Sequence, residues 1–134
     1  MWLWGAAALA WSAALTYFDL TRLRLPDWLT LPGAVVMFAA CVAHPVGLWG
    51  FLWPSLYLVA GSGVGGGDVK LAVPLGIACA LLAGVGGVLA AILAASLFTL
   101  VAAAVTRRRG LAHGPSMLAA AWLVGLYALA QGDL

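Results

Sequence analysis

Six apolar runs separated by short links make up most of this chain. They cover about 2–18, 28–43, 46–60, 69–82, 85–105 and 115–130. Runs that approach the ~20 residues a helix needs to cross the hydrocarbon core of a bilayer are typical of transmembrane helices. Only 7% of the residues are charged and 66% are hydrophobic, which is too little polar material to cover a soluble domain of this size. We therefore predict an all-α, polytopic membrane protein with about six transmembrane helices, forming a single domain over residues 1–134.

The positively charged residues all fall in the first, third and fifth links. These links carry Arg22 and Arg24, then Lys70, then the arginines at 107–109. Odd-numbered links share one face of a serpentine bundle, and clustered Lys and Arg mark the cytoplasmic face. We therefore expect a multi-pass protein of the inner (plasma) membrane with both termini outside. Because no Lys or Arg precedes the first run, residues 2–18 are interpreted as a retained helix and not as a signal peptide.

The fourth run contains two residues that weaken a helix. Pro74 and Gly76 predict a kink or a loosened turn within it. An uncharged link around Ala83 and Gly84 separates this run from the fifth.

Two carboxylates lie at comparable depth, at the cytoplasmic ends of the first and fourth runs. Asp19 follows Tyr17 and Phe18, while Asp68 follows the glycine-rich stretch 61–67. Carboxylates near hydrocarbon tend to face a protein interior or a water-filled cavity. If the two helices touch, the pair would hold one proton, a state suited to acid–base hydrolysis of a peptide bond. Charge placement alone favours the simpler interpretation that both are juxtamembrane charges that help to set topology.

The residues around both carboxylates resemble the type IV prepilin peptidases. Residues 19–30 read DLTRLRLPDWLT and are similar to the first-aspartate motif of that family. Residues 65–70 read GGGDVK and match its Gly-x-Gly-Asp-x-Lys motif, and Gly114-Pro115 resembles its late Gly-Pro element. The resemblance implies an intramembrane aspartic peptidase with Asp19 and Asp68 as catalytic pair. It further implies cleavage of the leader of prepilin-like proteins just after a glycine, at the cytoplasmic face.

Three residues next to Asp68 are expected to support substrate binding. Gly65 and Gly67 have no Cβ, so they would let a substrate backbone approach closely. Lys70 follows the carboxylate by two positions, where it would steady Asp68, orient the substrate or anchor at lipid headgroups.

The segment after Asp19 supplies the other expected supporting residues. Pro26 would fix the turn into the second helix, and Thr21 and Thr30 would hydrogen-bond backbone near Asp19 or cap that helix. Asp27 stands where the family usually has Asn, a departure that adds a third carboxylate. If ionised, Asp27 would raise the pKa of the pair further.

No metal or other cofactor is expected. Cys41 and Cys79 are isolated within apolar runs and lack metal-ligand spacing. Larger members of the family carry an additional region with Cys-x-x-Cys pairs and methylate the new N-terminus, so the resemblance implies no methyltransferase activity here. The chain looks more like the small enzymes that process tight-adherence (Flp-type) pilins. The expected partners are a prepilin-like substrate and membrane lipid, with no nucleic acid. We interpret His113 as a loop residue on the same face as the aspartates.

Two functions of other classes stay open at this point. In a transporter or ion-conducting protein, Asp19 and Asp68 would bind a cation or relay protons. Its weakness is that both acids lie at one membrane face, with no charge in the interior of the span. In a catalytically silent subunit of a pilus machine, the site would bind substrate without cleaving it. The sequence leaves the oligomeric state undetermined.

Overall fold

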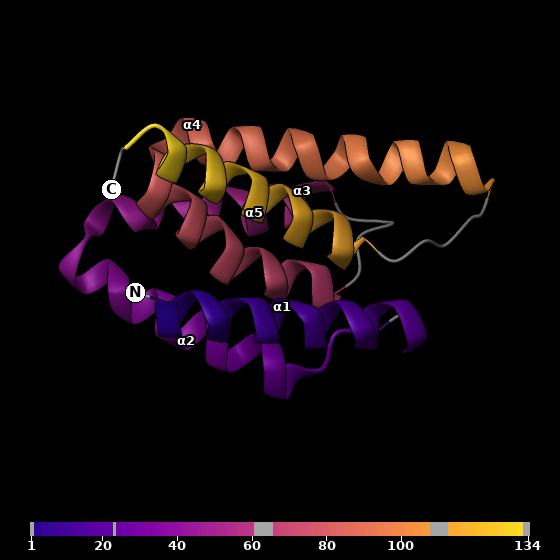
Figure 1. The fold of residues 1–134 in the computed structure, drawn as a ribbon, viewed down its shortest axis with the longest axis horizontal. Coiled ribbons are helices and arrows are strands. Elements are labelled where there is room, and N and C mark those ends of the chain that lie inside the picture. The colour runs from indigo at the N-terminus through magenta and orange to yellow at the C-terminus, as the bar shows by residue number, and fades with distance from the viewer. Residues whose placement is uncertain (1, 23, 61–65, 108–112, 133–134) are drawn as a thin grey trace.

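All regular secondary structure in the described part of the chain is helical. A computed structural model describes residues 2–22, 24–60, 66–107 and 113–132, in which no strand occurs. The elements are α1 (Trp2–Arg22), α2 (Asp27–Ala43), the 3-10 helix η1 (Pro45–Phe51), α3 (Leu52–Ala60), α4 (Gly66–Thr106) and α5 (Gly114–Ala130), shown in Figure 1. The all-α prediction is therefore confirmed, and the element bounds follow the predicted apolar runs closely.

Gly84 divides α4 into two halves that run in opposite directions. Its dihedrals, φ 68° and ψ −164°, lie in a region that is essentially open only to glycine. Figure 1 shows the chain turning back there, from the rose half of α4 to the orange half. Within Gly66–Thr106 the non-helical dihedrals are confined to Gly84, so Pro74 and Gly76 stay helical and the break lies at the predicted link instead.

Large apolar side chains cover much of the outer surface. Val59 on α3 is 85% exposed, Val42 on α2 is 83% exposed and Leu93 on α4 is 72% exposed. Such a surface suits contact with lipid and not with water. By length and hydropathy, one described helix, Gly67–Thr106, meets the requirement for crossing a membrane, and the other apolar helices identified, α2, η1–α3 and α5, are shorter. Six membrane crossings therefore remain a prediction.

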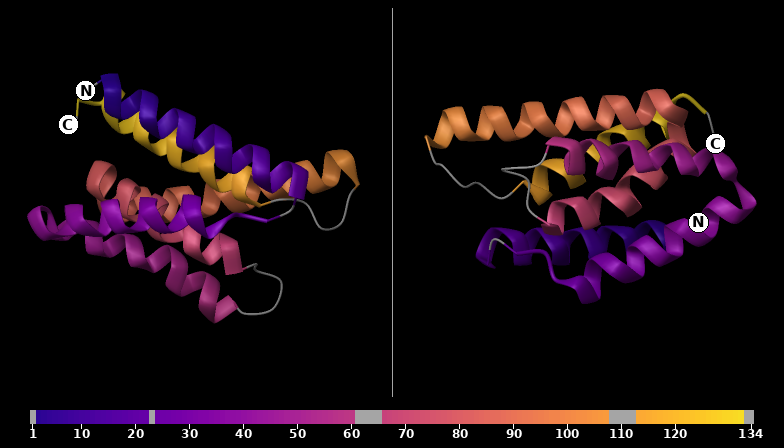
Figure 2. Two further views of the ribbon diagram at one scale, coloured as in Figure 1. Left: turned by 90° about the horizontal axis from the view of Figure 1, so that it is seen from below. Right: turned by 180° about the vertical axis from the view of Figure 1, so that it is seen from behind.

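The core forms around α4, which contacts α2, η1, α3 and α5. Its fully buried members include Leu15 of α1, Trp53 of α3, Leu71 of α4 and Met117 of α5. Helix α1 lies along α5 in the antiparallel direction, as Figure 2 shows. This arrangement places the end of α1 beside the beginning of α5.

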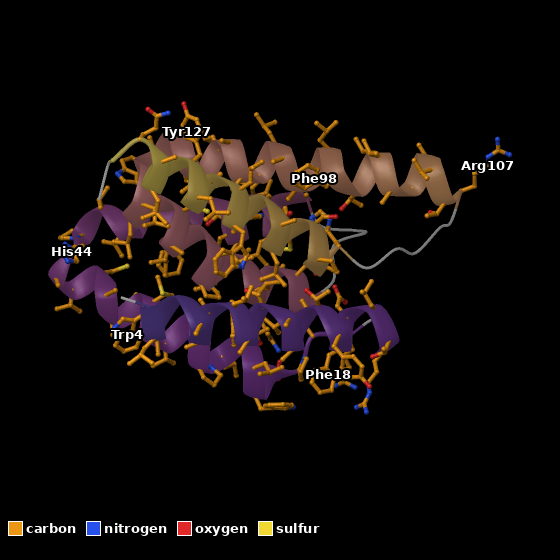
Figure 3. The ribbon with its side chains drawn as sticks, in the orientation of Figure 1. Trp4, Phe18, His44, Phe98, Arg107 and Tyr127 are labelled. Atoms are coloured by element: carbon orange, nitrogen blue, oxygen red, sulfur yellow. The ribbon has the colours of Figure 1, made fainter. Side chains whose placement is uncertain are left out.

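Most of the described charge gathers towards one end of the bundle. The charged residues there are Asp19 and Arg22 near the end of α1, Arg24 in the link that follows, Asp27 at the start of α2, Asp68 and Lys70 in the first turns of α4, and Arg107 just after α4. In Figure 3, Phe18 and Arg107 lie towards this end, while Trp4 and His44 lie towards the other. Residues 108 and 109 of the predicted arginine cluster lie outside the described residues.

The helix η1 crosses α4 with direct backbone contact. A Cβ atom added to Gly76 would overlap the carbonyl oxygen of Gly50, and one added to Gly50 would overlap the backbone of Ile77. Both positions therefore need glycine for close approach, not for an unusual dihedral angle.

We expect Gly76→Ala to destabilise the protein by about 1–3 kcal/mol, because the added methyl group forces η1 away from α4. Thermal unfolding in detergent micelles measures the change. Gly86→Ala is the matched control, since it lies on the same helix and its added Cβ would meet nothing within 4 Å. Equal stability of the two variants would contradict the crossing.

Candidate active site

Asp19 is buried at the last turn of α1 and is held by the start of α5. Its side chain is 5% exposed, and its Oδ2 atom accepts a hydrogen bond of 2.8 Å from the backbone N–H of Gly114. This N–H belongs to the first turn of α5, where backbone donors have no partner within their own helix. The positive end of the α5 dipole also lies against the carboxylate, so both effects stabilise ionised Asp19.

The contact with Asp19 requires glycine at position 114, because there is no room for a side chain. A Cβ atom added there would overlap Asp19 Oδ2, and it would lie 3.4 Å from Leu25 Cδ2. In the Gly-Pro element, the N–H of Gly114 is therefore the donor to Asp19. Pro115 cannot donate, because proline has no backbone N–H.

Asp68 lies in the first turn of α4 and faces the same region. It is partly buried, and its carboxylate is close enough to Asp19 for an electrostatic interaction. Within the part of the chain that the structure describes, no donor is hydrogen-bonded to Asp68. The structure therefore places two carboxylates that are 49 positions apart (68 − 19), one from α1 and one from α4, at the same end of the bundle. Their catalytic role stays a proposal.

Leu25 lies close to two glycines of the site, Gly67 and Gly114. It is 5% exposed, and a Cβ added to Gly67 would lie 3.0 Å from the Leu25 Cβ atom. Gly67 therefore allows the start of α4 to approach the link between α1 and α2. Gly65, the other glycine expected to support binding, lies outside the described residues.

Pro26 forms the N-cap of α2 in an extended conformation, with φ −72° and ψ 139°. Its carbonyl oxygen accepts hydrogen bonds from the N–H groups of Leu29 and Thr30 and from the Thr30 hydroxyl. Thr21, in contrast, is exposed and donates its hydroxyl to the Tyr17 carbonyl within α1. Neither threonine is hydrogen-bonded to the Asp19 carboxylate.

Lys70 contacts Asp27 and not Asp68. The Lys70 Nζ atom lies 2.6 Å from Asp27 Oδ1, and the two side chains are 45% and 58% exposed. This ion pair joins the start of α4 to the start of α2, and it balances the third carboxylate that the sequence adds near the site. Because the pair is exposed, we assign it a contribution of about 0.2–1 kcal/mol at most.

His113, predicted from the sequence to be a loop residue, lies directly before Gly114 and is the N-cap residue of α5. Its Nε2 atom lies 2.6 Å from the Tyr57 hydroxyl, and its Nδ1 atom lies 2.6 Å from the Thr99 hydroxyl. Burial lowers the pKa of His113, which favours the neutral ring at pH 7. In the sequence, the one feature that could have indicated a role for His113 is its position directly before Gly114-Pro115.

The comparisons with known proteins add one finding. A protein-family model described as the type IV leader peptidase family matches residues 6–104. This range includes Asp19 and Asp68 and ends before Gly114. No curated protein and no solved structure matches the chain.

We expect Gly114→Ala to destabilise the protein by more than about 2 kcal/mol, because it combines overpacking with the loss of a charge-assisted hydrogen bond to a buried carboxylate. Unfolding in detergent micelles gives the measurement. Gly125→Ala serves as the control on the same helix, since its Cβ would meet only the end of the Leu82 side chain, at 3.2 Å. A larger loss in Gly125→Ala than in Gly114→Ala would rule out the proposed contact.

Proposed function

Since the chain belongs to the type IV leader peptidase family, we propose that it is a membrane aspartic endopeptidase that removes the leader of prepilin-like proteins. Membership of this family implies a protease with a leader peptidase function in general terms. The finer proposal is that Asp19 and Asp68 activate water, and that cleavage follows a glycine at the cytoplasmic face. The observation that carries it is that Asp19, in the last turn of α1, and Asp68, in the first turn of α4, lie at one end of the bundle, where Leu25 lies close to both Gly67 and Gly114.

The hydrogen bonds suggest different roles for the two acids. Asp19, which accepts the Gly114 N–H and faces the α5 N-terminus, is the ionised member and takes a proton from the attacking water. Asp68 is the protonated member and donates its proton to the scissile carbonyl oxygen as the water oxygen bonds to the carbonyl carbon. Asp19 then passes its proton to the leaving nitrogen as the C–N bond breaks, and Asp68 recovers a proton from the collapsing diol. Water is consumed and both acids return to their starting states.

We further propose that the chain crosses the inner membrane six times, with the acids at the cytoplasmic face and both termini outside. The family is membrane-embedded, and the outward-facing apolar side chains fit contact with lipid. The turn at Gly84 supports counting the halves of α4 as two crossings. Arg22, Lys70 and Arg107 then lie on the positive, cytoplasmic side.

Asp19→Asn and Asp68→Asn should each lower the rate of leader cleavage by ~100- to 10,000-fold, because each amide keeps the shape of the side chain but cannot exchange the proton. The rate is measured with purified protein in detergent and a prepilin-like substrate of defined N-terminal mass. Asp133→Asn is the matched control, since it removes a carboxylate from the tail after α5 and should retain the activity. Full activity in either of the first two variants would exclude the dyad.

Chelators should leave cleavage unchanged, because the dyad mechanism needs no metal ion. Among the residues whose placement is described, no cluster of three or more His, Cys, Asp or Glu side chains is suited to holding one. Activity is compared before and after incubation with EDTA or phenanthroline. Loss of cleavage that added zinc restores would contradict the aspartic mechanism.

A further inference from the structure

The side chain of His113 ties the beginning of α5 to two other elements. One ring nitrogen is hydrogen-bonded to Tyr57 on α3 and the other to Thr99 in the second half of α4, both at 2.6 Å. The Tyr57 ring also packs against the His113 ring, with centroids 5.6 Å apart. Because both nitrogens are engaged, the imidazole cannot rotate without losing a hydrogen bond.

One partner of His113, Tyr57, is itself fixed by the core. Tyr57 is 7% exposed and packs edge-on against Trp53, which is fully buried. A neutral imidazole has one donor and one acceptor nitrogen, so one hydroxyl donates to the ring and the other accepts from it. His113 thus joins the start of α5 to α3 and to the second half of α4.

The peptide bond that follows His113 carries the N–H that contacts Asp19. His113 is the N-cap residue of α5, and its side chain makes no hydrogen bond to its own helix. Instead, the Gly114 N–H is donated to the Asp19 carboxylate of α1. Any shift of the His113 backbone therefore moves this donor relative to the carboxylate.

We propose that His113 is a positioning residue: by bridging Tyr57 on α3 and Thr99 on α4, it holds the Gly114 N–H on the Asp19 carboxylate. It does not touch the substrate in this scheme. The expected effect of His113 on kcat rests on the proposed peptidase function. Its effect on the position of the Gly114 N–H does not. A donor misplaced by about 1 Å can lower a catalytic rate by ~100-fold without changing substrate affinity.

His113→Ala should lower kcat by ~10- to 100-fold and leave KM within about twofold, because the substrate still binds but Asp19 is misplaced. His113→Asn retains a group near the position of Nδ1, and His113→Gln retains one near Nε2. Each should therefore restore part of kcat through one of the two partners. An unchanged kcat in His113→Ala, with a cleaving wild type, would overturn the proposal.

Ser12→Ala is the matched control for general loosening of α1 against α5. It removes the hydrogen bond of 2.9 Å from Trp122 Nε1 to Ser12 Oγ, which joins the same two helices away from Asp19. We expect kcat within about twofold of the wild type. A fall as large as that in His113→Ala would mean that His113 acts only through helix packing, and the proposal would be wrong.

Amide hydrogen exchange at Gly114 tests the positioning without any cleavage assay. In ¹⁵N-labelled protein, His113→Ala should speed exchange of the Gly114 N–H by ~10-fold or more, while Ser12→Ala should leave it unchanged. Unchanged exchange in His113→Ala would overturn the inference. If the wild type cleaved no leader but His113→Ala sped this exchange, the proposed function would fail while the positioning of Gly114 would stand.

Discussion

The hydrogen bond from the Gly114 N–H to the Asp19 carboxylate joins residues 95 positions apart, and the candidate site depends on it. It can form because α1 and α5 lie antiparallel, so that the end of one helix meets the start of the other. It also needs glycine at 114, since any side chain there would overlap the carboxylate. Ionising a buried acid such as Asp19 is costly. The Gly114 N–H and the positive end of the α5 dipole offset part of this cost.

The scarcity of charge explains why the site lies at one end of the bundle. A chain whose outer surface suits lipid cannot place carboxylates along its flanks without a large desolvation cost. The acids and bases therefore gather where helices begin and end, and where Lys70 and Asp27 can pair at the surface. Within this end, Asp19 is enclosed by protein while the exposed pair stays in polar surroundings. The fold thus keeps the buried Asp19 apart from the exposed Asp27 at the same end of the bundle.

Much of this arrangement was predictable from the sequence. The apolar runs give the helix ranges, because length and uninterrupted hydrophobicity depend on local residues alone, and the break at Gly84 falls at a predicted link. The two acidic motifs indicated the family, which the match over residues 6–104 confirms. Tertiary contacts were beyond reach. The pairing of Lys70 with Asp27, the crossing of η1 over α4 and the bridge made by His113 all depend on how distant segments pack.

We propose that this end of the bundle hydrolyses a leader after a glycine. The most direct test is the N-terminal mass of prepilin-like substrates co-expressed with the wild-type chain. Each substrate is tested in two versions, one with its native glycine before the cleavage point and one with a bulky residue in place of that glycine. The account predicts that the leader is lost after the glycine in the native substrate and retained in the altered one. Intact leaders across a panel of native substrates, or cleavage that ignores the glycine, would contradict it.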